Sequence, residues 1–195
     1  MFKKTLIIIT HPFRLLFASL NRKVIKYAYS REKTLKHDIH SDFRARALNG
    51  LHQLFVGSLP QPFYIHNNTI KFYSDGSLMS VQAYYVGEIE YHQMKYLIDN
   101  HIANNMVFLD IGGHHGAFAI IVAQELKKKN LIGQILTFEP DKRNISFIEK
   151  NIRSNSLNEY ITLVPYAVSN KNGKGKFVLS SDNSCNWLEI DSSLT

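Results

Sequence analysis

Residues 106–116, which read Met-Val-Phe-Leu-Asp-Ile-Gly-Gly-His-His-Gly, constrain the fold of this chain more than any other stretch. An apolar run leads to Asp110, three glycines follow within five positions, and a second apolar run begins at Ala117. This pattern predicts a buried parallel strand, a tight turn and a helix, with Asp110 at the carboxyl end of the strand. Ligands of open α/β sheets bind beyond that end, so the stretch indicates a small-molecule site. The alternative is a glycine turn that only packs the helix onto the strand.

Strand and helix patterns alternate through residues 106–164. Two further strands are predicted at 134–138 and 160–164, with helices at 116–129 and from Asp141 to about Asn155. Such alternation is typical of right-handed crossover units. The predicted fold class is therefore α/β, with three parallel strands and a sheet whose faces are both covered by helices.

The segments on either side predict additional elements. Two aromatic and β-branched runs flank Asn67-Asn68, which predicts a β-hairpin at 63–73, and a helix is expected from Glu88 to about His101. A glycine-rich turn at 170–175 followed by apolar residues 177–179 predicts a second hairpin. We expect two domains: a basic helical N-terminal lobe at 1–60 and an α/β domain at 61–195.

The net charge of +7 is concentrated near the N-terminus. Residues 1–50 hold 11 Lys and Arg against three acids, whereas residues 51–195 hold 12 against 13. Pro12 and Arg14 interrupt the first apolar stretch, so a membrane-spanning helix is not expected. A basic amphipathic helix can instead contact a membrane surface, although a solvated helix surface is the simpler interpretation. With Cys185 as the only cysteine, we expect a cytoplasmic protein, peripheral membrane contact being an open alternative.

Asp110 and Glu139 follow neighbouring predicted strands and should project at the same rim of the sheet. Glu139 stands 23 residues after Gly116, close to the offset of about 20 residues at which an acid binds a ribose diol in dinucleotide folds. The glycines let backbone approach a ligand, and the helix start at Gly116 attracts a carboxylate or a phosphate. A nucleoside-containing ligand is therefore expected.

The spacing of the glycines decides which nucleoside ligand is expected. His114 and His115 stand two residues after Gly112 and Gly113, so no G-x-G-x-x-G fingerprint is present, and no phosphate-binding loop follows. The remaining pattern is Asp-x-Gly-x-x-x-Gly. An acid in this turn would repel a pyrophosphate but suits an ammonium group. S-adenosylmethionine carries an ammonium group, a carboxylate and a ribose, and it is the predicted cofactor.

The chain resembles the FkbM-type S-adenosylmethionine-dependent methyltransferases, a Rossmann-like group that methylates hydroxyl oxygens of small molecules and sugars. The resemblance covers about residues 85–179 and is carried by Val107-Phe108-Leu109-Asp110-Ile111-Gly112-Gly113-His114-His115-Gly116, Phe138-Glu139-Pro140-Asp141, Leu163-Val164-Pro165-Tyr166-Ala167-Val168-Ser169 and Glu90-Tyr91. It implies a partial class I methyltransferase sheet. The cofactor residues that it implies are Asp110, Gly112, Gly113 and Gly116 around the methionine part, Glu139 at the ribose, and Glu90, Tyr84 or Tyr85 closing the pocket.

The chain departs from this family in two places. The usual turn reads Asp-x-Gly-Ala-Asn-x-Gly, whereas Gly113 and His114 stand at the alanine and asparagine places. We interpret His114 and His115 as structural residues, not as a catalytic base. The family's next strand carries a motif similar to Lys-Ile-Asp-Val-Glu-Gly, which has no counterpart before Thr195. We therefore expect a domain that is truncated at its C-terminus, with an unpaired edge beside its first strand.

The predicted protein is an enzyme that transfers a methyl group from S-adenosylmethionine to a hydroxyl oxygen of a sugar or another small molecule. Its catalytic residues are not identified, and whether the chain is active alone stays open. No metal site is expected, because no histidines pair with cysteine at zinc-site spacing. Nucleic acid is not an expected partner of this enzyme. The alternative is a non-catalytic nucleoside-fold scaffold whose basic lobe binds nucleic acid or a membrane surface.

Overall fold

The computed structural model describes residues 59, 61–170, 172–178 and 187–189. The basic lobe predicted at 1–60, and with it the predicted membrane contact, lies outside the described residues except at Leu59.

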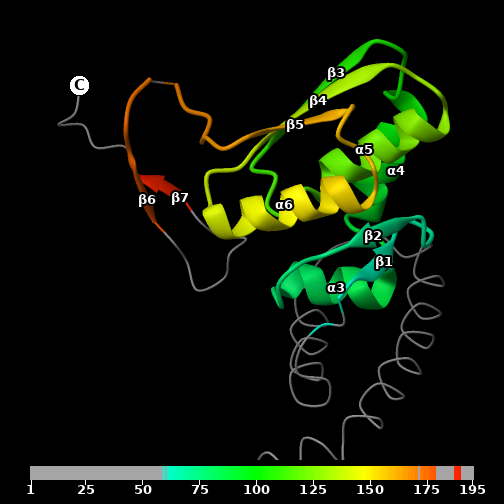
Figure 1. The fold of residues 1–195 in the computed structure, drawn as a ribbon, viewed down its shortest axis with the longest axis horizontal. Coiled ribbons are helices and arrows are strands. Elements are labelled where there is room, and N and C mark those ends of the chain that lie inside the picture. Colours follow the sequence, from blue (N-terminus) through cyan, green and yellow to red (C-terminus); the bar gives the residue numbers. More distant parts are fainter. Residues whose placement is uncertain (1–58, 60, 171, 179–186, 190–195) are drawn as a thin grey trace, which may run out of the picture.

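A three-stranded parallel sheet forms the centre of the described fold (Figure 1). It consists of β3 (Met106–Ile111), β4 (Gly133–Phe138) and β5 (Ile161–Val164), in the order β3-β4-β5. Helix α5 (Ala117–Lys128) connects β3 to β4, and α6 (Lys142–Ser154) connects β4 to β5. The predicted α/β alternation with three parallel strands is confirmed, and the observed boundaries differ from the predicted ones by one or two residues.

Helices cover only one face of this sheet. The strand order follows the chain order, so two right-handed crossovers place α5 and α6 on the same side (Figure 1). Ile120 and Ile148 on these helices are fully buried. On the opposite face of β3, Val107, Leu109 and Ile111 are 62%, 54% and 62% exposed. The prediction that both faces are covered and that β3 is a fully buried strand is therefore wrong, because no described helix lies over these side chains.

The predicted first hairpin is confirmed. Strands β1 (Phe63–Ile65) and β2 (Ile70–Phe72) pair antiparallel, and helices α3 (Leu78–Val86) and α4 (Tyr91–Asn100) follow. Helix α4 corresponds to the helix predicted from Glu88. The sequence pattern does not predict α3, because its apolar residues are spread around the helix and do not line one face.

Side-chain amides of α6 take the place of a strand partner at the outer edge of β2. Asn151 accepts a hydrogen bond from the backbone N–H of Tyr73 and donates one to the Tyr73 carbonyl oxygen, at 2.7 and 2.9 Å. One helical turn later, Asn155 makes the same pair of bonds with Lys71, at 2.9 and 2.8 Å. Asn151 also donates to the carbonyl oxygen of His115 at 2.9 Å. Helix α6 thereby joins the hairpin to the turn that follows β3.

The second hairpin differs from the predicted one. Strand β6 (Lys176–Val178) pairs with β7 (Trp187–Glu189), and not with residues before the glycine-rich turn. Residues 165–170 form no strand, and their side chains are exposed. In this register Phe177 is paired with Leu188 and Val178 with Trp187.

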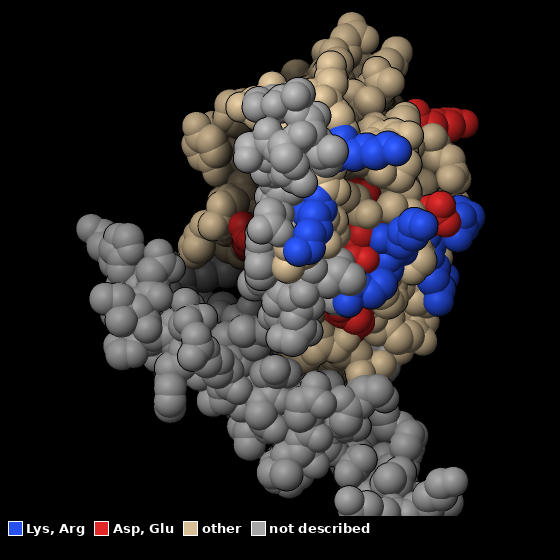
Figure 2. All heavy atoms as spheres, turned by 90° about the vertical axis from the view of Figure 1, so that its left-hand side faces the viewer, with Lys and Arg blue, Asp and Glu red and all other residues tan. Residues whose placement is uncertain are grey.

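The described surface carries charges of both signs. Figure 2 shows basic and acidic side chains close to one another on one face, in agreement with the nearly neutral balance of residues 51–195. Among the described helices, none combines the length and the apolar character that crossing a membrane requires.

Candidate functional site

The turn after β3 is held by the neighbouring strand β4. The backbone N–H groups of Gly112 and Gly113 both donate to the carbonyl oxygen of Phe138, at 2.9 and 3.0 Å. Gly116 caps α5 with a left-handed φ of 80°. A Cβ at Gly116 would lie 3.4 Å from Ile148, which is close to an ordinary van der Waals contact, so the positive φ and not a lack of space favours glycine here.

Asp110 is oriented by the adjacent strand. The hydroxyl of Thr137, which is opposite Asp110 in the β3–β4 register, donates to its Oδ2 at 3.0 Å. Burial raises the pKa of Asp110 above its ordinary value, while hydrogen bonds from Thr137 and the backbone of Ala119 act in the opposite direction. The carboxylate is therefore fixed in direction before any ligand arrives.

Glu139 follows β4 and binds the glycine turn. Its Oε2 accepts a hydrogen bond from the backbone N–H of His114 at 2.8 Å. Its Oε1 accepts one from the backbone N–H of Asp141 at 2.9 Å and a longer one from Asn144 Nδ2 at 3.4 Å. Asp110 and Glu139 thus both lie at the carboxyl rim of the sheet. A carboxylate accepts about four hydrogen bonds, so about one acceptor position of Glu139 remains for a further donor.

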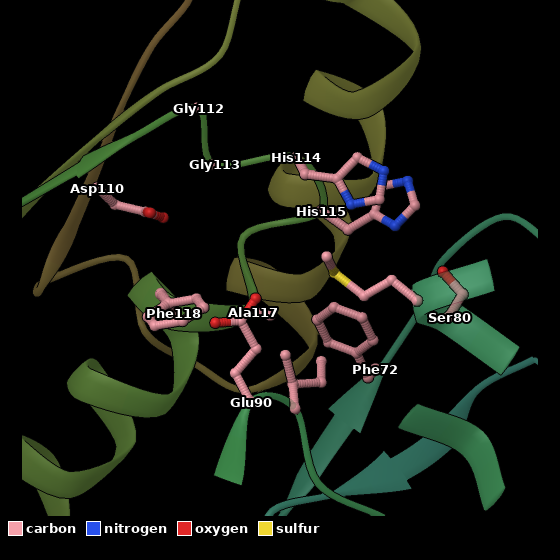
Figure 3. Close-up of a pocket in the computed structure, with 12 residues that line it drawn as sticks. Phe72, Ser80, Glu90, Asp110, Gly112, Gly113, His114, His115, Ala117 and Phe118 are labelled. Carbon is pink, nitrogen blue, oxygen red and sulfur yellow. The ribbon is translucent and has the colours of Figure 1, made fainter. Parts of the chain in front are cut away.

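A pocket opens beside the glycine turn (Figure 3). Its cavity volume is about 140 Å³, smaller than the roughly 300–1,000 Å³ of a typical small-molecule site. The polar and glycine residues among those that line it are Ser80, Glu90, Asp110, Gly112, Gly113, His114 and His115. The lining residues include two carboxylates, and none of those that the structure describes is a lysine or an arginine.

Four of the six predicted cofactor residues come together in this pocket, namely Glu90, Asp110, Gly112 and Gly113. The other two, Gly116 and Glu139, do not line it: Gly116 shapes the start of α5, and Glu139 supports the turn.

Tyr84, one of the two aromatic residues predicted to close the pocket, does not line it. Tyr84 packs in the core, with its ring centroid 5.7 Å from that of Phe63 in an edge-to-face arrangement. The side chain of Tyr85 lies outside the described part of the chain.

Two lining residues have left-handed backbones. Glu90, at the start of α4, has a φ of 42°, and His114 has a φ of 51°. For a residue that is not glycine or asparagine, this conformation costs roughly 1–2 kcal/mol. Figure 3 shows the Glu90 side chain directed toward the start of α5, near Ala117 and Phe118. The strained backbone at Glu90 thus accompanies a carboxylate that faces the pocket.

The rings of His114 and His115 stack beside Asp75, with centroids 3.7 Å apart. The side chain of His115 is 2% exposed, and its Nε2 has no hydrogen-bond partner among the described residues. Burial, together with the charge that His114 can carry, lowers the pKa of His115 to about 3, so its ring is neutral near pH 7. Asp75, His114 and His115 each place one potential ligand atom within 4.8 Å of the others, so this cluster could hold a metal ion.

The structure accounts for glycine at position 113. A Cβ at this position would overlap the Oγ1 of Thr137 and lie 3.2 Å from Oδ2 of Asp110. Since Thr137 orients Asp110, any side chain at position 113 would disturb the bond that fixes the carboxylate.

Sequence reasoning missed two residues of the site. Thr137 is a buried polar residue near the carboxyl end of β4, and its role becomes visible once β3 and β4 are placed in register. Asp75 stands in a Ser-Asp-Gly sequence that reads as the end of the hairpin. Its approach to His115 joins distant parts of the chain, and no local pattern indicates it.

A scan against known protein families finds no match for the chain, and a search of curated proteins finds none either. The function of the pocket is therefore argued from its own geometry and charge.

Proposed function

We propose that the pocket binds S-adenosylmethionine and that the protein transfers its methyl group to a hydroxyl oxygen of a sugar or another small molecule. The observation that carries this proposal is the charge of the pocket at the carboxyl end of β3. Asp110 and Glu90 line it, and none of its described lining residues is a lysine or an arginine.

This charge favours a cationic ligand over a phosphate. Opposite charges a few ångströms apart attract strongly in a partly buried site, and like charges repel to the same degree. S-adenosylmethionine presents an ammonium group and a sulfonium centre, both positive. A nucleotide would bring phosphates against Asp110 and Glu90, and the lining residues that the structure describes include no basic side chain to compensate them.

The residues around the turn fit the other parts of this cofactor. The pocket lining at Gly112 and Gly113 has no side chains, so a ligand can approach the backbone closely. Glu139 is buried and does not line the pocket; its bonds to His114, Asp141 and Asn144 hold the turn, and a bond to the ribose would use the acceptor position that they leave. In this arrangement the ribose and the glycine turn share one carboxylate.

The cofactor supplies an activated methyl carbon, and the chain's part in the reaction is to position the two reactants. Thr137 holds Asp110 in a fixed direction, so little reorganisation is needed when the ligand's cation binds. Phe72 and Phe118, which also line the pocket, exclude water from its apolar side.

Calorimetry with S-adenosylmethionine tests this proposal on the full chain. Asp110→Asn and Glu90→Gln should each weaken binding by about 10- to 100-fold, because each loses an ionic contact with the ligand. The matched control is Asp99→Asn, since Asp99 is an exposed acid of α4 that pairs with Lys95. The control should bind like the unaltered protein.

Two results would contradict the proposal. One is the absence of binding, and the other is binding of ATP as tight as that of S-adenosylmethionine. If the cofactor binds, formation of S-adenosylhomocysteine in the presence of a panel of sugars and other alcohols reports methyl transfer. If it does not, steeply salt-dependent binding of the full chain to a polyanion would favour the scaffold alternative.

A further inference from the structure

We propose that Asp75, His114 and His115 form a binding site for a divalent transition-metal ion of the zinc type, in the wall of the pocket. Two imidazole rings and one carboxylate are a ligand set that zinc and its neighbours in the first transition row accept. Magnesium and calcium prefer oxygen ligands alone and fit this set poorly. The proposal does not depend on S-adenosylmethionine.

The distances between the ligand atoms are close to those of an occupied site. Oδ2 of Asp75 lies 3.7 Å from Nε2 of His115, too far for a hydrogen bond. With bonds of about 2.0–2.1 Å to a tetrahedral ion, two ligand atoms lie roughly 3.3 Å apart. All three potential ligand atoms fall within 4.8 Å of one another, so modest side-chain rotations would bring them around one ion.

The buried ring of His115 points to a missing partner. Its Nε2 is shielded from solvent and has no hydrogen bond within the described part of the chain. Buried polar atoms in native proteins almost always have a partner, and an orphaned one calls for an ion or another ligand. A neutral imidazole presents a lone pair at that nitrogen, which is the form that binds metals.

The surroundings also orient the carboxylate. Oδ1 of Asp75 accepts a hydrogen bond from the backbone N–H of Ser77 at 2.9 Å and a longer one from the Ser80 hydroxyl at 3.4 Å. Oδ2 is the atom that faces His115. Metal ligands are commonly held in this way by hydrogen bonds to the atoms that do not bind the ion.

Three protein ligands leave one position of a tetrahedral site for water or for an oxygen ligand. His114 and His115 line the pocket, so this open position adjoins the space in which we propose that the cofactor and its acceptor bind. The competing interpretation is a core contact in which the two rings and Asp75 pack together and bind no ion.

Calorimetry of the metal-free full chain with zinc chloride distinguishes these interpretations. We expect one ion per chain. Asp75→Asn and His115→Gln should each weaken binding by about 10- to 100-fold or more, since removal even of groups that only support a ligand has effects of this size. The control is His92→Gln, because His92 is exposed on α4 and does not belong to the cluster. Cobalt(II) should give the visible absorption of a four-coordinate site, and Asp75→Asn should abolish it.

Thermal unfolding keeps the test decisive if His115→Gln folds poorly. Asp75 is only partly buried, so Asp75→Asn should fold, and zinc should raise the melting temperature of the unaltered chain but not that of this variant. The proposal is overturned if zinc does not bind. It is also overturned if binding is unchanged in Asp75→Asn, which would assign the ion to other histidines of the nine in the chain. S-adenosylmethionine binding measured with a chelator present reports on the cofactor pocket separately.

Discussion

Asp110, Thr137 and Gly113 act as one unit at the scale of single residues. Thr137 donates to Asp110, and Gly113 leaves the space in which the Thr137 hydroxyl lies. The role of each of these three residues therefore depends on the other two. The unit explains why an acid in the middle of an apolar segment can be buried and still keep one direction.

Gly113→Ala is expected to destabilise the protein by about 1–3 kcal/mol, because a forced overlap in a packed region costs this much. The measurement is urea unfolding of the variant and of the unaltered chain. The same variant should bind S-adenosylmethionine more weakly, since the displaced hydroxyl no longer orients Asp110.

Thr137→Ala provides the control for this prediction. It removes the atom with which the new Cβ would overlap, so Gly113→Ala should cost much less in a Thr137→Ala background than in the unaltered chain. Equal costs in the two backgrounds would show that the overlap is not the cause.

At the scale of elements, α6 closes the edge of β2 with two asparagines. Asn151→Ala should cost about 2–3 kcal/mol, because it removes the partner of the partly buried N–H and carbonyl of Tyr73 and of the buried carbonyl of His115. Asn155→Ala is the matched variant one turn later and should cost about 1 kcal/mol, because its bonds to Lys71 are exposed to solvent. Chemical unfolding of both variants measures the difference. Equal losses would mean that burial of these bonds does not decide their contribution.

His66 links the first hairpin to α5 and to the loop before α4. Its Nε2 lies 2.9 Å from Oε1 of Glu125, and its Nδ1 lies 3.8 Å from Oε2 of Glu88. The pKa of His66 is raised above its ordinary value, chiefly by Glu88 and further by Glu125, whereas the burial of His66 lowers it. Burial raises the pKa of Glu125, but His66 and Lys128 together lower it by more, so the pKa of Glu125 lies below its ordinary value.

The His66–Glu125 pair should therefore stabilise the protein most between about pH 4.5 and pH 6.5, the ordinary pKa values of the two groups. The contribution of His66 is complete below its unfolded pKa and is lost as the pH rises through its raised folded pKa. The contribution of Glu125 is complete above its unfolded pKa and is lost as the pH falls through its lowered folded pKa. Unfolding free energies of the unaltered chain and of His66→Gln, measured from well below pH 4.5 to well above pH 6.5, should differ most inside this window and less on either side of it. A difference that does not change with pH would contradict the assignment.

At the scale of the whole molecule, local patterns predict the elements better than they predict what surrounds them. The strand–turn–helix at Asp110 and the position of Glu139 at the same rim follow from periodicity and strand order. Coverage of β3 does not follow, because an apolar run looks the same whether one face or both faces are covered. The pairing of β6 with β7 and the approach of Asp75 to His115 depend on distant segments, and no local pattern encodes them.

The open face of the sheet predicts an uneven sensitivity to mutation. Leu109→Thr should change the unfolding free energy by no more than about 0.5 kcal/mol, because Leu109 is largely exposed and threonine suits a strand. Leu126→Ala on α5 should cost about 2–5 kcal/mol, because Leu126 is fully buried. Urea unfolding of both variants measures this. A large loss in Leu109→Thr would show that another part of the chain covers this face.

At Glu90 and His114, which have left-handed backbone conformations, a substitution that stabilises the fold can weaken ligand binding. Both residues line the pocket, and glutamate, unlike histidine, is not a residue type enriched in this conformation. Glu90→Asn should raise the unfolding free energy by a few tenths of a kcal/mol up to about 1 kcal/mol, because asparagine tolerates a positive φ, and it should weaken cofactor binding by removing a carboxylate. Selection for thermal resistance alone would then favour such substitutions and produce a more stable protein that binds the cofactor more weakly. Directed evolution of this chain should therefore screen for ligand binding in every round.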